Sequence, residues 1–478
     1  MPDLSASDPT TEQERLLGSM VGQHPVADDL GGRFDAAGFA LYLVGGIVRD
    51  TLLGRSSSDL DFATSAPPEA TEKILRGWAD DLWLTGARFG TVSARKDDWH
   101  LEITTFRSDA YTPGSRHPDV EYGTDIESDL ARRDFTVNAM AVQLPEHRFV
   151  DPYGGLRDLN AKTLRTPIAA ERSFADDPLR MVRLARFAAV LDAQPDEAAL
   201  HAATAMAEQV DSVSRERIRE ELNRLLCSDH PGRGLDLLCD TGLADRFLPE
   251  LPALRMQHDP LHHHKDVYRH TLAVVAKCPV HDLTLRLAAL LHDIGKPATR
   301  EFSGDSKVTF HGHDHVGARM ARRRLEALRY PKAVINDVCD LVYLHLRFHG
   351  YAEDAWTDNA VRRYVRDAGT QRQLERLNWL TRADVTTRNQ AKSRRLSEAM
   401  DDLEARIAAL QEEEEIRKIR PALDGRAIMD YLGLEPGPLV GRARTMLLDA
   451  RLERGPMTDG EAYALLDVWA DEQGIARP

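Results

Sequence analysis

The sequence predicts an α+β protein in which a small head with a mixed sheet precedes an all-helical remainder. Short apolar runs typical of strands occur in the first third of the chain, beginning with Leu41–Val44. From Ser173 onward, apolar residues recur instead at the 3.6-residue spacing of helices. The length of 478 residues suits about three domains of roughly 150 residues each. An apolar content of 42% is sufficient for their cores.

The composition argues against several classes of protein. No apolar run approaches the roughly 20 residues that a membrane-spanning helix needs. The four cysteines lie far apart, which argues against a disulfide framework and fits a reducing compartment. The net charge of −15 disfavours wholesale nucleic-acid binding but allows a local basic surface. We therefore expect a cytoplasmic protein without membrane contact, whose residues 1–20 form a disordered tail that is not a secretory signal.

The head, predicted over residues 21–166, contains the most informative stretch of the chain. The strand Leu41–Val44 runs directly into Gly45 and Gly46, where a backbone without Cβ atoms can bend and approach a phosphate. A short helix carrying Arg49 follows, and the next strand contains Asp59 and Asp61. Alternation along a strand points these two carboxylates the same way, as in hard-cation sites for phosphoryl transfer. Each feature alone reads better as a tight turn or a solvated strand end, but their order makes a nucleotide site the better interpretation.

This stretch resembles the nucleotidyltransferase head of the superfamily that contains tRNA CCA-adding enzymes and bacterial poly(A) polymerases. The resemblance implies that Asp59, Asp61 and Glu102 are the catalytic carboxylates and that Asp59 and Asp61 bind Mg²⁺. It also implies that Gly45, Gly46 and Arg49 contact the nucleotide. Residues 86–93 and 99–106, the latter including Glu102, read as neighbouring strands, and residues 109–125 as a loop. In the family, that loop is flexible.

Two further blocks extend the resemblance. The segment RRDFTVNAMA (residues 132–141) could be an ordinary amphipathic helix start, but it matches a family block that implies nucleotide contacts from Arg133, Asp134 and Asn138. Helical residues 167–258 are predicted to form a neck that binds RNA and nucleotide. There, DDPLR resembles the family's base-reading motif, which implies that Asp177 and Arg180 read the base. On local grounds, Asp177 followed by proline is an acidic N-cap, and Asp176 stands where the family has glutamate.

Residues 259–390 are histidine-rich and contain the sequence HDIGK after a strongly apolar helix. A lone histidine is more often structural than a ligand, but this pattern resembles the HD metal-dependent phosphohydrolases. The resemblance implies a metal site made of His270, His292, Asp293 and Asp384, with His313 and His345 available for a second ion. Imidazoles with carboxylates suit Ni²⁺, Mn²⁺ or Co²⁺ better than Mg²⁺.

The helical tail is predicted over residues 391–478. Its glutamate run, Glu412–Glu415, is most simply a solvated helix face. The segment GLEPGPLVGRAR (residues 433–444) reads equally well as a phosphate-holding helix start or as the corner of a helical hairpin. Nothing in the sequence indicates the oligomeric state.

Together these features predict an enzyme that adds CCA to tRNA 3′ ends from CTP and ATP, with a possible phosphohydrolase activity in the HD domain. Two rival enzymes are a poly(A) polymerase and a partial CC- or A-adding tRNA nucleotidyltransferase. The chain has TGARFGTVSAR where bacterial poly(A) polymerases carry a basic run, and its loop at 109–125 looks intact. A non-catalytic RNA-binding protein is the alternative of another class, against which the retained metal carboxylates argue.

Overall fold

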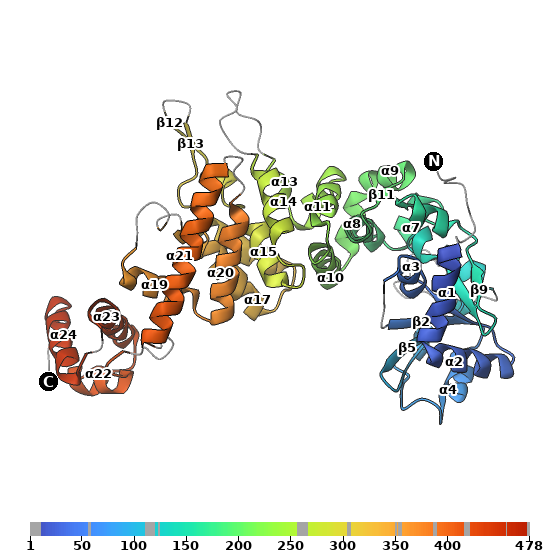
Figure 1. Cartoon of the computed structure of the whole chain (residues 1–478), viewed down its shortest axis with the longest axis horizontal. Helices are drawn as coiled ribbons and strands as arrows, with labels where there is room; N and C mark the ends of the chain where they lie inside the picture. The colour runs from blue at the N-terminus through green and yellow to red at the C-terminus, as the bar shows by residue number, and fades with distance from the viewer. Residues whose placement is uncertain are drawn as a thin grey trace. The chain divides into compact units, whose positions relative to one another are not determined.

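A computed structural model describes residues 11–55, 59–109, 120–122, 125–255, 266–303, 307–348, 351, 356–385, 390–414, 421–455 and 457–475. The chain forms two compact units. Unit 1 comprises the residues up to Ala253 together with Ala327–Arg329, and unit 2 comprises the rest. Figure 1 shows the sheet in unit 1 and the helical character of unit 2. This agrees with the α+β fold that the sequence predicts.

The head is built on a seven-stranded sheet whose order is β3-β4-β5-β2-β1-β8-β9. The β2–β5 pair is parallel and the other five pairs are antiparallel, so the sheet is mixed. The strands are β1 (Leu41–Val44), β2 (Asp59–Thr64), β3 (Asp81–Trp83), β4 (Thr91–Lys96), β5 (Trp99–Thr105), β8 (Ala141–Leu144) and β9 (Arg148–Val150). A separate two-stranded sheet pairs β6 (Arg107–Asp109) with β7 (Val120–Tyr122).

Strands β2, β4 and β5 have one buried face and one open face. Leu60, Phe62, Leu101 and Ile103 are buried, whereas Asp61 and Glu102, which alternate with them, are exposed. Helices α2 (Pro25–Ala36) and α4 (Pro68–Leu75) pack against the sheet, α2 on β1 and β8 and α4 on β4 and β5. The alternation in the sequence thus separates the core from an open surface that carries carboxylates.

Two local expectations need correction. Residues 11–20, which we expected to be disordered, belong to helix α1 (Thr11–Gln23), which contacts α2 and α3 (Gly46–Leu52). Residues 1–10 lie outside the described part of the chain. The segment expected to be a strand from residue 86 forms the short helix η1 (Ala87–Phe89), and β4 starts only at Thr91. Gly90, with φ 81°, makes this transition, because such a φ is open mainly to glycine.

The remainder of unit 1 is helical around α8 (Leu179–Leu191), which packs on α10 (Arg215–Leu226) and α11 (Pro231–Asp240). Ten of the thirteen residues of α8 are buried, which explains the apolar periodicity from Ser173 onward. The shorter elements are α5 (Ile126–Ala131), η2 (Thr136–Asn138), α6 (Gly155–Asn160), β10 (Thr163–Leu164), α7 (Ala170–Asp176), β11 (Gln194–Pro195), α9 (Glu197–Ala205), η3 (Ala207–Ser212), α12 (Leu243–Phe247) and α13 (Glu250–Ala253).

Unit 2 is organised around α15 (Leu283–Leu291), which contacts α14 (Val267–Lys277), α17 (Lys332–Leu344) and α20 (Gln371–Asp384). All residues of α15 from Thr284 to Leu291 are buried. The other elements before the tail are η4 (Pro297–Thr299), β12 (Glu301–Ser303), β13 (Lys307–Thr309), α16 (His313–Ala327), α19 (Asp358–Ala368) and α21 (Gln390–Glu414). Of the glutamate run, Glu412–Glu414 end α21, and their side chains and Glu415 lie outside the described part of the chain.

The last three helices are α22 (Gly425–Leu432), α23 (Pro438–Arg454) and α24 (Asp459–Glu472). They enclose a small apolar core that includes Ile428, Leu447 and Leu466. The segment from residue 433 is the corner between α22 and α23, with Gly433 in the left-handed region at φ 64°. This geometry contains both the corner and the helix start at Pro438, so a phosphate-holding role of that start stays a prediction. Among the described helices, none has the length and apolarity needed to cross a membrane.

Candidate active site and metal centre

A cavity of about 680 Å³ opens in unit 1 beside the carboxylate strand. All eight residues predicted to contact the nucleotide line it, together with Asp61. These eight are Gly45, Gly46, Arg49, Arg133, Asp134, Asn138, Asp177 and Arg180. They come from segments up to 135 residues apart (180 − 45), which the sequence alone could connect only through the family resemblance.

The Gly45 turn is required by its backbone conformation, and it also makes room for an arginine. Gly45 has φ 76°, and a Cβ atom there would lie 2.8 Å from Nη1 of Arg133. Arg49, one turn into α3, points its guanidinium at two partners. Its Nε and Nη2 bind the carboxylate of Asp50 at 2.9 and 2.8 Å, and its Nη1 donates to Oδ1 of Asn138 at 2.5 Å. The glycine turn thus lets an arginine of the RRDFTVNAMA block pack against the backbone of the first motif.

The carboxylates lie side by side across two strands. The parallel register of β2 and β5 places Asp61 directly opposite Glu102, and both are exposed. Neighbouring strands lie about 4.8 Å apart, so these two residues can share a ligand. Asp59 is paired with His100 in the same register, but its side chain lies outside the described part of the structure. Oxygen-only donors on an open sheet face suit Mg²⁺.

Asp134 is the centre of a buried hydrogen-bond network. Its Oδ2 accepts from Nε and Nη2 of Arg183 at 2.8 and 2.5 Å. Its Oδ1 accepts from Nδ2 of Asn138 at 2.9 Å and from the backbone N–H of Phe135 at 2.8 Å. Burial opposes ionisation of Asp134, but Arg183 and these donors outweigh it and hold the pKa of Asp134 below its ordinary value. Asp134 therefore lines the cavity while both of its oxygens are occupied by protein groups.

The two base-reading candidates stand at the start of α8. Asp177 accepts from the backbone N–H of Leu179 at 3.2 Å. The N-cap of α8 is Pro178 and has no side-chain capping bond, so Asp177 is not the N-cap that its sequence suggests. Its other oxygen binds Nη2 of Arg217 at 2.8 Å. Arg180 donates to Oγ of Ser173 at 2.8 Å and to the carbonyl of Arg132. Asp177 remains partly exposed, at 31% of its side chain, which leaves it accessible to a ligand in the cavity.

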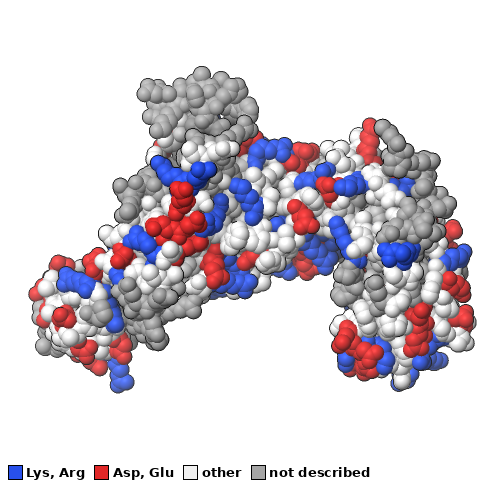
Figure 2. Space-filling view, viewed as in Figure 1, with Lys and Arg blue, Asp and Glu red and all other residues white. Residues whose placement is uncertain are grey.

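Sequence reasoning missed several residues of the cavity. Most of them are arginines of α8 and α10, and one is an aromatic residue of α8. The set is Arg132, Arg183, Arg186, Phe187, Arg217 and Arg224. The guanidinium carbons of Arg186 and Arg183 lie 4.0 and 5.5 Å from the centre of the Phe187 ring. The available signal was the spacing of Arg180, Arg183 and Phe187 on α8, which repeats at helical intervals and places them on one face. Figure 2 shows basic and acidic residues interspersed over the face in view.

The six predicted metal ligands of the HD domain converge in unit 2. Five of them stand on or next to helix ends: His292 follows α15, His313 begins α16, His345 follows α17, Asp384 ends α20 and Asp293 comes after His292, while His270 lies within α14. His270, His292 and Asp293 form one group able to hold a metal ion, and Asp293, His313 and His345 form a second. Asp293 belongs to both. Its Oδ2 is 3.3 Å from Nε2 of His292, and its Oδ1 is 3.5 Å from Nε2 of His313.

The orientation of the imidazoles fits metal ligation. The Nδ1 atoms of His292, His313 and His345 each lie within hydrogen-bond distance of a backbone carbonyl, at 2.8, 2.8 and 2.6 Å. When Nδ1 carries the proton, Nε2 keeps a lone pair directed into the site. Nε2 of His313 and Nε2 of His345 are buried without a hydrogen-bond partner. Burial beside His292 lowers the pKa of His345 to about 4, so this ring is neutral at neutral pH.

The charge balance of this centre favours a bound cation. Burial opposes ionisation of Asp293, yet His292 and Lys296 hold the pKa of Asp293 well below its usual range. Asp384, 2.8 Å from Nε2 of His270, likewise has a lowered pKa despite its burial, because His270 and His292 face it. Conversely, Asp293 raises the pKa of the buried His292. The buried carboxylate of Asp293 and the partly buried one of Asp384 thus draw positive charge to a point between the histidines.

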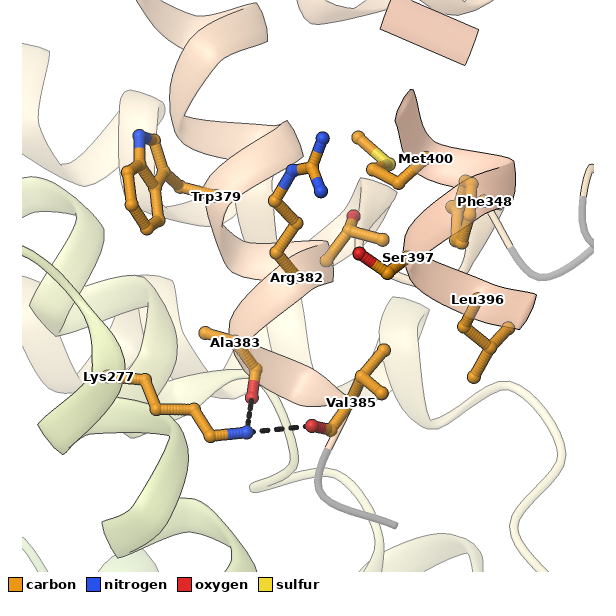
Figure 3. Close-up of a pocket in the computed structure, with 10 residues that line it drawn as sticks. Lys277, Phe348, Trp379, Arg382, Ala383, Val385, Leu396, Ser397 and Met400 are labelled. Atoms are coloured by element: carbon orange, nitrogen blue, oxygen red, sulfur yellow. Dashed lines mark hydrogen bonds between the residues drawn. The ribbon is translucent and has the colours of Figure 1, made fainter. Parts of the chain in front are cut away.

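A second cavity, of about 420 Å³, lies beside the end of α20 that carries Asp384. Figure 3 shows Lys277 of α14 reaching the last turn of α20, where its Nζ donates to the carbonyls of Ala383 and Val385 at 3.2 and 2.7 Å. A cation at a helix C-terminus satisfies carbonyls that have no partner within the helix. Lys277 therefore fixes the backbone on both sides of Asp384. The segment 386–389 lies outside the described part of the chain.

Comparisons with known proteins agree with this arrangement. The Poly A polymerase head domain model matches residues 41–165, a model for the probable RNA and SrmB-binding site of polymerase A matches residues 194–254, and the HD domain model matches residues 261–412. The fold and the carboxylate-lined cavity define a nucleotidyltransferase joined to a helical RNA-binding region and an HD domain.

Individual relatives narrow this class. The chain is 34% identical to the A-adding tRNA nucleotidyltransferase of Deinococcus radiodurans, over 90% of this chain and 95% of that protein. It is also 34% identical to the CC-adding tRNA nucleotidyltransferase of Thermus thermophilus, over 89% and 93% respectively. The chain belongs to the tRNA nucleotidyltransferase family. The crystal structure of the Bacillus stearothermophilus CCA-adding enzyme in complex with CTP has the same fold, with a TM-score of 0.67 and 24% identity over 95% of this chain and 99% of that one.

Replacing Asp134 by Asn should destabilise unit 1, because it leaves the partly buried Arg183 without its main counter-charge. Breaking one side of a fully buried ion pair costs about 3–5 kcal/mol, and the loss here should be smaller because the Arg183 side chain is 29% exposed. The folded pKa of Asp134 is lowered, so the stability it contributes is complete above its unfolded pKa of about 3.9 and is lost as the pH falls through the folded pKa. Urea unfolding measured at pH 3 to 7 should therefore give a lower free energy of unfolding for the variant than for the parent protein. This difference should narrow below about pH 4.

Asp211→Asn is the matched control, because Asp211 pairs with Arg246 on the exposed surface. Exposed pairs contribute about 1 kcal/mol or less. If Asp134→Asn and Asp211→Asn lost the same amount of unfolding free energy, the claim that Asp134 stabilises unit 1 through its buried network would be contradicted.

Proposed function

We propose that the protein adds CCA to the 3′ end of tRNA, using CTP and ATP, in the cytoplasm. The observation that carries the proposal is the single cavity that brings Asp61, the Gly45–Gly46 turn, Asn138, Asp177 and eight arginines together. A nucleoside triphosphate has four negative charges to neutralise and a base edge to read, and the cavity offers guanidinium groups and a carboxylate for these two tasks. The family to which the chain belongs supports tRNA as the acceptor.

In this proposal, Asp59, Asp61 and Glu102 hold Mg²⁺. Two ions are expected there: one, when bound, would lower the pKa of the RNA 3′-hydroxyl, and the other would neutralise charge on the departing pyrophosphate. The chain itself positions the reactants. Arg133 and the backbone at Gly45 and Gly46 stand where triphosphate oxygens need donors.

In this proposal, the choice of nucleotide depends on which hydrogen-bonding edges of a base Asp177 and Arg180 can pair with. Cytosine and adenine each present an amino donor beside a ring-nitrogen acceptor, which a carboxylate next to a guanidinium complements. Uracil and guanine present a carbonyl and an N–H in those places, so both contacts become repulsive. Arg217 and Ser173 hold Asp177 and Arg180 in position from the protein side.

Partial addition is the alternative to full CCA addition, because two relatives that match over about 90% of the chain are A-adding and CC-adding enzymes. The loop sequence at residues 109–125 has the length of a complete loop, which favours full addition. Most of that loop lies outside the described residues. Extending transcripts that lack CCA, end in C or end in CC, with each nucleoside triphosphate alone and with CTP and ATP together, separates these activities. We expect CCA on the first transcript. Products ending in CC only, a single A only after CC, or long A tracts would each overturn the proposal.

Asp61→Ala should abolish nucleotide addition without unfolding the head, because it removes a carboxylate from the open face and leaves the buried face intact. Asp59→Ala should have the same effect. The assay is extension of tRNA lacking CCA, with thermal unfolding measured in parallel. Asp98→Ala, at the exposed turn between β4 and β5, is the control and should be fully active. Near-normal turnover by Asp61→Ala would rule out the carboxylate assignment.

Asp177→Ala should relax nucleotide choice rather than stop the reaction. A good bidentate base contact provides about 1–3 kcal/mol of discrimination, so the preference for CTP over UTP should fall by about 5- to 150-fold. The measurement is the ratio of kcat/KM for CTP and UTP. Glu197→Ala, at the start of α9, gives the matched control of another acidic residue at a helix start. A parent protein that already uses UTP as well as CTP would exclude this model of selection.

A second activity is favoured by the histidine–carboxylate centre of unit 2. We propose that it binds a transition metal such as Ni²⁺, Mn²⁺ or Co²⁺ and hydrolyses phosphoesters at blocked or damaged tRNA 3′ ends. The donor set fits, because three buried histidines keep Nε2 directed at buried Asp293. A metal ion held there would lower the pKa of a bound water and polarise a phosphoryl oxygen.

The double variant His292→Ala with Asp293→Ala should lose bound metal and phosphoester hydrolysis but retain CCA addition. Metal content by mass spectrometry and hydrolysis of 2′,3′-cyclic phosphates across a panel of divalent ions provide the two readouts. His281→Ala, an exposed histidine of the same unit, should change neither. If the parent protein binds metal but hydrolyses no phosphoester under any condition, the proposed hydrolysis is wrong and the metal centre is structural.

A further inference from the structure

One row of residues crosses the open face of the head sheet from the carboxylates to the sheet edge. The register pairs Asp61 with Glu102, Glu102 with Ser93, and Ser93 with Trp83. Residues paired across neighbouring strands point to the same face of a sheet. Trp83, on the edge strand β3, therefore shares the face of Asp61 and Glu102. With strands about 4.8 Å apart, its backbone lies about 10 Å from that of Glu102.

Trp83 is exposed and already takes part in a ring stack. Trp83 is 42% exposed. The rings of Trp83 and His100 are stacked, with centroids 6.3 Å apart and an interplanar angle of 23°. Exposed Leu84 and Phe89 follow in the segment that joins β3 to β4, and the guanidinium of Arg88 lies 4.5 Å from the Phe89 ring centroid. We call Trp83 and His100 the aromatic platform.

The platform offers stacking rather than charge. The charged residues in the row beside it are Asp81, Arg95 and, on the far side of His100, Asp59. Asp81 and Arg95 bind each other, with Nε of Arg95 2.8 Å from Oδ2 of Asp81. Flat aromatic surfaces without a net charge bind nucleobases through their π-faces and tolerate any base. A platform of this kind suits single-stranded RNA, whose unstacked bases are available for such contacts.

The position of the platform relative to the nucleotide cavity indicates which RNA the platform would bind, namely the RNA that carries the attacking 3′-hydroxyl. The cavity includes Asp61 and residues from α3, η2, α8 and α10, but its lining does not include Glu102 or Trp83. In a phosphoryl transfer, the attacking and leaving oxygens lie roughly in line on opposite sides of the phosphorus. If the triphosphate occupies the cavity, the attacking 3′-hydroxyl must therefore approach from the other side of the carboxylates. That side is the one occupied by β5, β4 and β3.

We propose that the aromatic platform stacks a base near the 3′ end of the acceptor RNA and so guides its terminal hydroxyl to the carboxylates. This inference rests on the proposed nucleotidyl transfer and adds the path of the second substrate. Trp83 acts as a positioning residue, because the chemistry takes place about two strand widths away. It reads no sequence, which allows the same platform to serve as the 3′ end grows and its last base changes.

Kinetics of Trp83→Ala and Trp83→Phe on tRNA lacking CCA test the proposal. Loss of one stacked base should raise the KM for RNA by about 5- to 150-fold in Trp83→Ala. The KM for CTP should stay unchanged, and Trp83→Phe should recover most of the RNA affinity. Because no phosphate contact is removed, the salt dependence of RNA binding should keep its slope. Leu84→Ala, an exposed apolar neighbour, is the matched control and should behave like the parent protein.

Crosslinking provides an independent readout. With 4-thiouridine at the last or next-to-last position of the RNA, irradiation should label the tryptic peptide that spans residues 77–88 and contains Trp83. An unchanged KM for RNA in Trp83→Ala would overturn the proposal and leave the exposed patch to another partner, such as a protein. A parent protein that extends no tRNA would contradict the proposed function itself. Extension by the parent with no effect of Trp83→Ala would contradict only the platform.

Discussion

The contact between the buried carboxylate of Asp134 and the guanidinium of Arg183 joins the two halves of the nucleotide cavity. Asp134 follows the short helix α5 of the head, and Arg183 lies in the middle of α8. A buried charge is tolerated only where its partners are complete, and here four donor atoms occupy the two oxygens of Asp134. Any displacement of α8 from the head would therefore leave one or both charges without compensation. The helix that carries Asp177 and Arg180 is consequently fixed against the head.

The same network reaches the phosphate side of the cavity. Asn138 donates to Asp134 and accepts from Arg49, which in turn binds Asp50. Arg183 also bonds Glu221 of α10 at 3.3 Å, and Glu221 forms an ion pair with Arg186 at 3.0 Å. A continuous chain of charged and amide groups thus links α3, η2, α8 and α10. Because these bonds are made by the protein alone, the cavity has its shape before a nucleotide or an RNA enters.

Sequence reasoning predicted much of this arrangement where local rules apply. Alternation of Asp61 with buried Leu60 and Phe62 fixes the carboxylate face, and the run after Val44 requires the turn at Gly45. Resemblance supplied the residues that local rules could not, including Asp384, which lies 91 positions after Asp293 (384 − 293) and joins the metal centre only through the packing of α20. The role of Asp134 was less accessible. Its sequence position suggests a ligand contact, whereas the fold commits both of its oxygens to Arg183, Asn138 and the backbone.

Other features depended on tertiary structure alone. The arginines of α10 reach the cavity only because α8 and α10 pack together, and no local pattern near Arg217 indicates a partner 40 residues earlier. The alignment of Trp83 with Glu102 likewise requires the register of three strands, which neither turn residues nor alternation in β3 could specify. Residues 11–20 were mistaken for a tail because their polar composition conceals a helix that packs on α2 and α3.

The central claim is that one preformed cavity selects the nucleotide before RNA is bound. Equilibrium dialysis of the RNA-free protein with labelled CTP, ATP, UTP and GTP, in the presence of Mg²⁺, tests it most directly. The account predicts that CTP and ATP bind one site in mutual competition and that UTP and GTP bind at least about 5-fold more weakly, as expected for one lost base contact. Equal binding of all four nucleotides, or no binding of any nucleotide until tRNA is added, would contradict it.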